Sequence, residues 1–80
     1  MTREEVFKRL NAVFQDVFDD DSITVSDTTV AADIDGWDSF EHINLIVAIE
    51  KEFSFKIPMG KVVTMKNVGE MVDLILEMGK

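Results

Sequence analysis

The stretch Asp33-Ile34-Asp35-Gly36-Trp37-Asp38-Ser39-Phe40 ends a long acidic connection and leads into the most strongly patterned helix of the sequence. Asp38 is a favourable N-cap residue, and Glu41 three positions later predicts an Asp-x-x-Glu capping box. Ser39 then falls in the first helical turn, where its hydroxyl should face solvent beside free backbone N–H groups. Because this end of a helix is the positive end of its dipole, the position suits a group such as a phosphate ester.

Apolar residues recur at helical spacing after this start, which predicts a helix over residues 39–53. They are more numerous than one core-facing stripe requires, so we expect Ile43 and Val47 to remain partly exposed. Spare apolar positions beside acids suit a partner-docking surface, and they equally suit a helix buried on two sides by a small bundle. The apolar positions are Phe40, Ile43, Leu45, Ile46, Val47, Ile49 and Phe53.

Two further capping boxes mark the other long helices. Thr2-x-x-Glu5 begins a helix over residues 3–18, whose apolar stripe faces one way and whose polar residues face solvent. The acids at 19–21 end it, because negative charge is unfavourable at a helix C-terminus. Asn67-x-x-Glu70 begins a helix that runs to residue 77, with Gly79 ending it. Between them, residues 60–65 form a short helix at best.

Residues 19–37 show no sustained period and predict a long connection, which is unusual in so small a chain. We expect Ile23, Val25, Val30 and Ile34 to pin it to the core, with a short helical turn at residues 30–32. The chain therefore predicts an all-α fold. It is a small antiparallel bundle of three main helices plus one short helix, in a single domain over residues 1–80.

The composition narrows the function classes. The net charge of −8 comes from 16 acidic and 8 basic residues, and such a surface repels nucleic acid and anionic membrane. No apolar run approaches the length of a membrane span, and there is no signal-peptide core. The chain has no cysteine, so thioester chemistry would need an attached thiol. We expect a soluble, cytoplasmic monomer.

The central motif resembles the acyl carrier protein family. The resemblance is carried by Gly36-Trp37-Asp38-Ser39-Phe40 placed mid-chain, by the apolar pattern ending at Glu52-Phe53, and by Ile57-Pro58, and it covers nearly the whole chain. It implies that Ser39 carries 4′-phosphopantetheine, whose thiol holds an acyl, aminoacyl or polyketide intermediate as a thioester. It also implies that Asp38 helps a phosphopantetheinyl transferase to place magnesium and coenzyme A, and that Trp37 shields the base of the arm.

The same resemblance places a partner-binding surface on the second long helix, where acyl-loading, synthase or transferase enzymes would dock. Asn44 and Lys51 stand where acids are common in the family, and residues 61–66 are basic here. We therefore expect a dedicated set of partners from a specialised pathway. We also hypothesise that the bundle shelters a short acyl chain among Phe7, Phe14, Ile46, Ile49 and Ile75. The partner positions are Glu41, Ile43, Asn44, Val47, Glu50 and Lys51.

The same residues allow other interpretations. Without the resemblance, Ser39 is an ordinary first-turn residue, and the chain is an unmodified acidic helical adaptor. An enzyme using His42 with nearby carboxylates is improbable with a single histidine and no Gly-x-Ser-x-Gly elbow, so we expect no catalysis and read His42 as a surface side chain. A calcium loop starting at Asp33 fails, because its sixth position is Asp38 rather than glycine.

Overall fold

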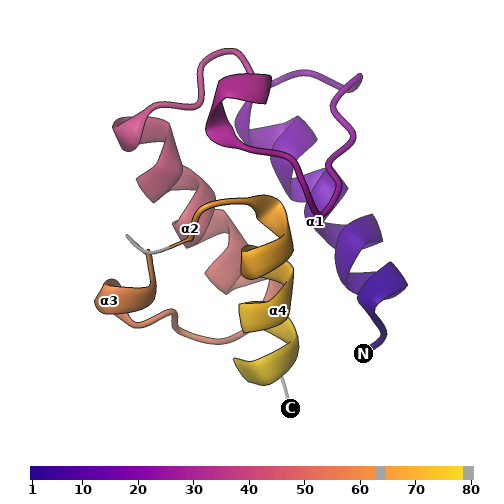
Figure 1. Ribbon diagram of the computed structural model, residues 1–80, viewed down its shortest axis with the longest axis vertical. Coiled ribbons are helices and arrows are strands. Elements are labelled where there is room, and N and C mark those ends of the chain that lie inside the picture. Colours follow the sequence, from indigo (N-terminus) through magenta and orange to yellow (C-terminus); the bar gives the residue numbers. More distant parts are fainter. Residues whose placement is uncertain (63–64, 79–80) are drawn as a thin grey trace.

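The computed structural model describes residues 1–62 and 65–78, and every regular element in these residues is helical (Figure 1). The elements are α1 (Arg3–Val17), the 3₁₀ helix η1 (Ala31–Asp33), α2 (Ser39–Phe53), α3 (Met59–Val62) and α4 (Val68–Met78). The predicted all-α fold is confirmed, and the long helices begin where their caps predicted. Residues 63–64 and 79 of the predicted third and fourth helices lie outside the described residues.

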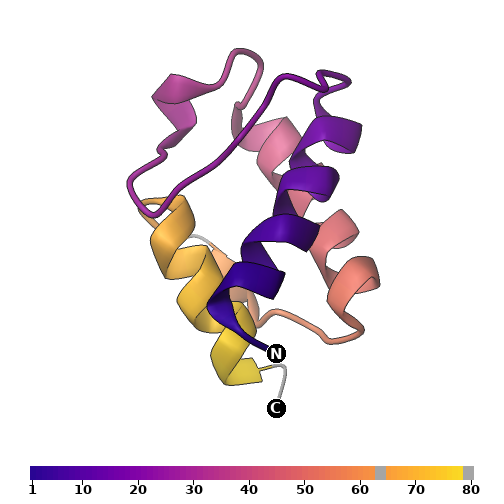
Figure 2. The same cartoon turned by 90° about the vertical axis from the view of Figure 1, so that its right-hand side faces the viewer.

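The long helices pack around α1, which contacts both α2 and α4. In Figure 2, α1 rises from the N-terminus while α2 and α4 descend, so α1 runs opposite to both of them. The segment that contains α3 returns the chain to the start of α4, and this is why α2 and α4 share a direction. The N-terminus and the last turn of α4 therefore lie at the same end of the molecule.

The two ends of α1 are closed by different devices. Thr2 forms the predicted capping box, because its hydroxyl accepts from the N–H of Glu5 at 3.2 Å and the Glu5 carboxylate accepts from the N–H of Thr2 at 3.3 Å. At the other end Asp19 takes a left-handed conformation with φ of 50°, and the Asp20 N–H donates to the Gln15 carbonyl at 3.0 Å. This is a Schellman closure, which ends the helix one residue earlier than predicted.

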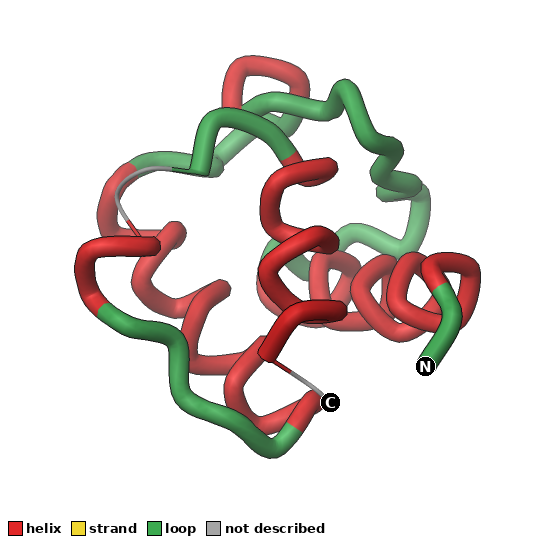
Figure 3. The backbone as a smooth tube through the Cα atoms, turned by 60° about the horizontal axis from the view of Figure 1, so that its bottom comes forward, coloured by secondary structure: helices red, strands yellow, loops and turns green. Residues whose placement is uncertain are grey.

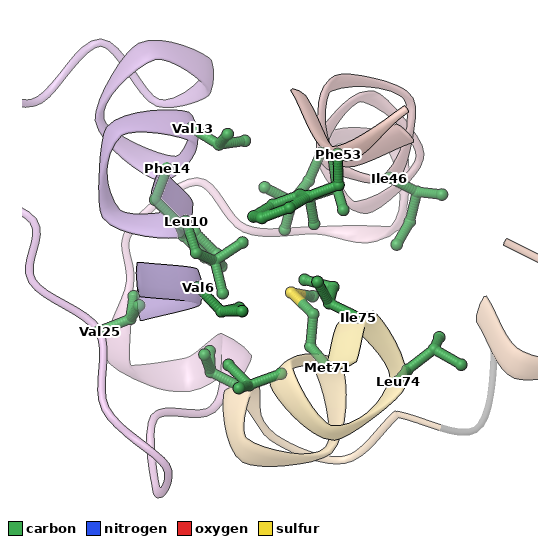
Figure 4. Packing of buried hydrophobic residues seen from close by; sticks show 14 of the residues in the cluster. Val6, Leu10, Val13, Phe14, Val25, Ile46, Phe53, Met71, Leu74 and Ile75 are labelled. Atoms are coloured by element: carbon green, nitrogen blue, oxygen red, sulfur yellow. The ribbon is translucent and has the colours of Figure 1, made fainter. Parts of the chain in front are cut away.

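One apolar core joins the three long helices. Leu10 and Phe14 of α1, Leu45 and Ile49 of α2 and Val72 of α4 are fully buried. In Figure 4, side chains of α1, α2 and α4 point toward one another across this space. Burial of a large aliphatic or aromatic side chain stabilises a fold by about 1.5–3 kcal/mol, so these side chains are the main source of stability. The other buried hydrophobics are Val6, Val13, Val25, Ile46, Phe53, Ile57, Val68, Met71, Leu74 and Ile75.

The connection from α1 to α2, drawn as a long loop in Figure 3, is held by polar side chains of α1 as well as by its own apolar residues. Asn11 accepts from the Val25 N–H at 2.7 Å, and Gln15 donates to the Ile23 carbonyl at 2.9 Å. The expectation that this polar face lies in solvent is therefore wrong for Asn11 and Gln15, which are half-buried. Val25 is buried as predicted, whereas Val30 is exposed and does not act as a pin.

The same connection caps α4. The backbone N–H groups of Val68 and Gly69 donate to the carbonyls of Thr29 and Asp27 at 2.9 and 3.0 Å. Asn67 also caps the helix, since its side-chain oxygen accepts from the Glu70 N–H at 2.9 Å. The predicted capping box is displaced by one residue, because the Glu70 carboxylate accepts from the N–H of Lys66 rather than from that of Asn67. Carbonyls of the loop thus accept from first-turn N–H groups, which have no acceptor within the helix itself.

Candidate functional site

A tight turn delivers the chain to the start of α2. Gly36 has a φ of +87°, a conformation that side-chain-bearing residues rarely adopt, and it is the third residue of a turn closed by the Trp37 N–H, which donates to the Ile34 carbonyl at 3.3 Å. The Asp38 N–H donates to the Gly36 carbonyl at 3.0 Å. The turn therefore fixes the position of Asp38 before the helix begins.

Asp38 is the N-cap of α2, as predicted. Its carboxylate accepts from the Glu41 N–H at 2.8 Å, and its carbonyl accepts from the His42 N–H at 2.8 Å. Ser39 is the first residue of the helix and is exposed, and its hydroxyl forms no hydrogen bond with any described residue. A nucleophilic oxygen thus lies at the positive end of a 15-residue helix, next to first-turn N–H groups that precede the intrahelical ladder.

Glu41 does not complete the expected capping box at this helix. The N–H of Asp38 donates to Gly36, and the Glu41 carboxylate accepts from the Asn44 side-chain amide at 3.0 Å. The side chain is therefore drawn along the helix surface, because Asn44 one turn later offers a donor while the turn at Gly36 already satisfies the N-cap N–H.

Trp37 anchors the site to the core. Its ring meets the edge of Phe14 with centroids 5.2 Å apart, and it lies 6.2 Å from the Phe18 ring. The indole N–H donates to Nδ1 of His42 at 3.1 Å. His42 is half-buried through this contact, so the expectation of a plain surface side chain is wrong. The two residues are five apart, but the sequence contains no signal that pairs them.

A pocket of about 500 Å³ opens beside Ser39. Its walls come from three segments: η1, the first turns of α2, and the residues from 65 onward that lead into α4. The sequence did not predict which residues line this pocket, since no local pattern joins residues that lie about 30 positions apart. The hypothesised acyl shelter names other residues, of which Phe14, Ile46, Ile49 and Ile75 are buried in the core. The pocket is lined by Ala31, Trp37, Asp38, Ser39, His42, Ile43, Met65, Lys66, Asn67 and Met71.

The predicted partner positions divide into two groups. Ile43 and Val47 are exposed, by 51% and 46%, as expected, and Asn44 and Lys51 are exposed with them. Glu50 is half-buried, and its carboxylate accepts from the Ile57 N–H at 2.7 Å, which ties the end of α2 to the following segment. Glu50 thus has a structural contact in addition to any role at the surface.

The described residues form neither a metal cluster nor a membrane-spanning helix. Within residues 1–62 and 65–78, no group of three or more histidine or acidic side chains is arranged to hold a metal ion. None of the helices in the same residues is long and apolar enough to cross a membrane.

Comparison of the chain with known proteins identifies a family to which this site is similar. A family model described as "Phosphopantetheine attachment site" matches residues 8–75. The acyl carrier protein of Lactobacillus acidophilus is 35% identical over 77 residues, covering 94% of each chain. That of a Picosynechococcus species is 32% identical over 75 residues, covering 92% of this chain and 91% of the relative.

A solved structure agrees with these relatives. The solution NMR structure of the holo acyl carrier protein from Geobacter metallireducens superposes with a TM-score of 0.85 at 42% identity. The match covers 91% of this chain and 84% of that one, so it extends over the bundle as a whole. By sequence, family model and fold alike, the chain belongs to the acyl carrier protein family.

Proposed function

We propose that Ser39 is the attachment point of 4′-phosphopantetheine, through which this carrier protein holds acyl intermediates as thioesters. The observation that carries the proposal is the exposed Ser39 hydroxyl in the first turn of α2, inside the region matched by the phosphopantetheine attachment family. The positive end of the helix dipole and the first-turn N–H groups favour the negative charge of the phosphodiester formed there.

The attachment is a phosphoryl transfer from coenzyme A. The Ser39 oxygen forms a bond to the phosphorus that carries the pantetheine, and the bond from that phosphorus to adenosine 3′,5′-bisphosphate breaks. The hydroxyl proton is lost, and the transferase supplies magnesium. Asp38 uses one carboxylate oxygen to cap the helix. Its other oxygen is then available to the transferase and its metal.

The residues around Ser39 prepare the base of the arm. Trp37, fixed by the aromatic rings of α1, forms one wall of the adjoining pocket, and Ile43 forms another. When bound, the arm supplies the thiol that this cysteine-free chain lacks. A tether of this kind works by effective concentration, because it presents the cargo repeatedly to any enzyme that docks nearby.

The chain acts as the carrier, and partner enzymes perform the chemistry. His42, the only histidine, already accepts a hydrogen bond at Nδ1 and contacts the indole face of Trp37. We propose that acyl-loading, synthase or transferase enzymes dock on α2 through Ile43, Asn44, Val47 and Lys51, with Glu41 and Glu50 at the edges. Fatty acyl, polyketide and aminoacyl cargo all fit this role.

Intact mass spectrometry tests the proposal. The folded chain is incubated with coenzyme A, magnesium and a broad-specificity phosphopantetheinyl transferase. We expect a gain of one phosphopantetheine, and we expect no gain in Ser39→Ala. Ser54→Gly is the matched control, because Ser54 is an exposed serine at the opposite end of the same helix, in a left-handed conformation that glycine tolerates.

The outcomes separate cleanly. A gain in both the wild type and Ser54→Gly, lost in Ser39→Ala, supports attachment at Ser39. Unchanged mass in the folded wild type, or a gain that persists in Ser39→Ala, overturns it. Circular dichroism of each variant checks that the bundle is intact.

We further propose that the carrier works as a cytoplasmic monomer over residues 1–80. A net charge of −8 supports the monomer, since like charges disfavour self-association. Light scattering of the purified chain tests the mass in solution, and fractionation of the producing cell tests the location.

A further inference from the structure

The charges of this acidic chain are unevenly distributed. Residues 51–66 contain four of its eight basic residues and one of its sixteen acids, whereas the fifty residues before them have a net charge of −9. The structure places this basic segment at the end of α2, through α3 and toward α4. Figure 1 and Figure 3 both show α3 on the side of the bundle away from α1. This segment therefore has a net positive charge, although Glu70, Asp73 and Glu77 of α4 lie beside Lys61 within it.

An apolar row on α2 leads to these charges. Phe40, Ile43 and Val47 are 73%, 51% and 46% exposed, and their spacing of three and four residues places them in one row on the helix surface. Lys51 continues the row by four more residues. The row begins directly after Ser39, so a protein bound along it would lie beside the proposed arm. We call Phe40, Ile43, Val47 and Lys51 the outer row.

A shallow hollow lies where the outer row ends. Its volume is about 280 Å³, and Val47, Lys51, Phe55 and Lys56 form its rim together with Glu50 and Ser54. The Glu50 carboxylate accepts from the Ile57 backbone, so it is partly engaged inside the fold. Lys51 and Lys56 are exposed and form no ion pair with any described residue. The charge offered to an incoming surface is therefore positive here.

The charges nearest the contact decide its sign, because at physiological ionic strength charges are screened beyond about 8 Å. Asp38 and Glu41 lie at the Ser39 end of the outer row, whereas Lys51 and Lys56 lie at its other end. A partner with lysine or arginine at that second end would set cations against Lys51 and Lys56. A partner with carboxylates would pair them.

We propose that the outer row, with Lys56, docks a partner enzyme that presents an apolar surface with aspartate or glutamate side chains where it meets Lys51 and Lys56. The contact has an apolar centre and a charged rim, which is the usual anatomy of a protein interface. That the partner is an enzyme acting on the arm rests on the proposed function. The chemistry of the contact rests only on the surface of α2 and the segment that follows it.

Two synthetic amphipathic helical peptides serve as probes. They share one apolar face and differ only in their flanking residues, which are glutamate in one and lysine in the other. Each is titrated into the ¹⁵N-labelled Ser39→Ala chain at low salt. We expect the glutamate-flanked peptide to shift the amide signals of the outer row and of Lys56. We also expect it to bind about tenfold more tightly than the lysine-flanked peptide.

Lysine-to-glutamate variants, which all change the charge by the same amount, test whether Lys51 and Lys56 cause this preference. Lys51→Glu and Lys56→Glu should each reduce or reverse the preference for the glutamate-flanked peptide. Lys8→Glu makes the same change of charge at an exposed position on α1 and should leave the preference intact. Val47→Ser should weaken the binding of both peptides at this site.

Three outcomes would overturn the proposal: tighter binding of the lysine-flanked peptide at the outer row, shifts confined to another face, or equal effects of Lys8→Glu and Lys51→Glu. Because Ser39→Ala cannot carry the arm, the peptide result does not depend on attachment. A failed mass gain would overturn the proposed function and leave the docking result standing, and the reverse also holds.

Discussion

The indole N–H of Trp37 donates a hydrogen bond to Nδ1 of His42 at 3.1 Å, and the two rings lie 19° from parallel with centroids 6.0 Å apart. The indole nitrogen can only donate, so Nδ1 must accept, and neutral His42 carries its proton on Nε2. The bond joins the turn before α2 to the first turn of α2, next to Ser39.

Replacing His42 should change the surroundings of Trp37. In His42→Phe no acceptor faces the indole N–H, so we expect the Trp37 Nε1–H resonance, and the fluorescence of this single tryptophan, to shift. In His42→Gln, whose side-chain oxygen can accept, the shift should be smaller. Equal shifts in the two variants would contradict the assignment of Nδ1 as the acceptor.

Gly69→Ala should destabilise the fold. A Cβ added at Gly69 would lie 2.7 Å from the carbonyl oxygen of Asp27, which is backbone and already accepts from the Gly69 N–H. Moving it would disturb the cap of α4, and we expect a loss of about 1–3 kcal/mol in the free energy of unfolding. Gly60→Ala is the control, since a Cβ there meets nothing within 4 Å. Urea unfolding of both variants measures the difference.

Asn11→Ala should loosen the connection between α1 and α2. The substitution leaves the half-buried N–H of Val25 without its acceptor, which should lower the free energy of unfolding by about 1–3 kcal/mol. Hydrogen exchange at the Val25 amide should accelerate more than exchange in the middle of α2. Lys8→Ala, a substitution at an exposed position of the same helix, should alter neither the free energy of unfolding nor hydrogen exchange at the Val25 amide. Equal acceleration throughout the chain would indicate global destabilisation instead.

The capping box at Thr2 should make stability fall in acid. The backbone N–H of Thr2, and then its hydroxyl, hold the pKa of Glu5 below its ordinary value. A carboxylate whose pKa is lower in the folded state stabilises the fold above its unfolded pKa, and this contribution is lost as the pH falls through the folded pKa. Glu5→Gln should therefore lower the melting temperature at pH 7, with the difference shrinking in acid. Glu4→Gln, in the same turn, should show a smaller difference at pH 7.

Helix positions were largely predictable because local chemistry determines them. Thr2, Asp38 and Asn67 accept from backbone N–H groups at the predicted starts of α1, α2 and α4, and apolar periodicity predicted their lengths to within about a residue. The attachment candidate followed from the same cap, because Ser39 comes directly after Asp38. Exposure of Ile43 and Val47 followed from the excess of apolar positions on α2.

The choice between competing hydrogen-bond partners was not predictable from the sequence. Glu41 had two possible donors, and the donor one turn later prevailed. Asn11 and Gln15 look like solvent-facing residues in a helical pattern, yet their amides satisfy backbone groups of a loop that the pattern leaves unplaced. The pocket beside Ser39 combines segments separated by about thirty residues, so only the folded chain reveals it.

The loop carbonyls that cap α4 have a consequence for the order in which the protein folds. Thr29 and Asp27 accept from N–H groups about forty residues later in the chain, so neither bond can form until synthesis has passed residue 69. Closing a loop of that length must precede the contacts that reward it. During translation α1 and α2 can pair first, while the acidic connection stays without its α4 partners until residues 68–78 have left the ribosome.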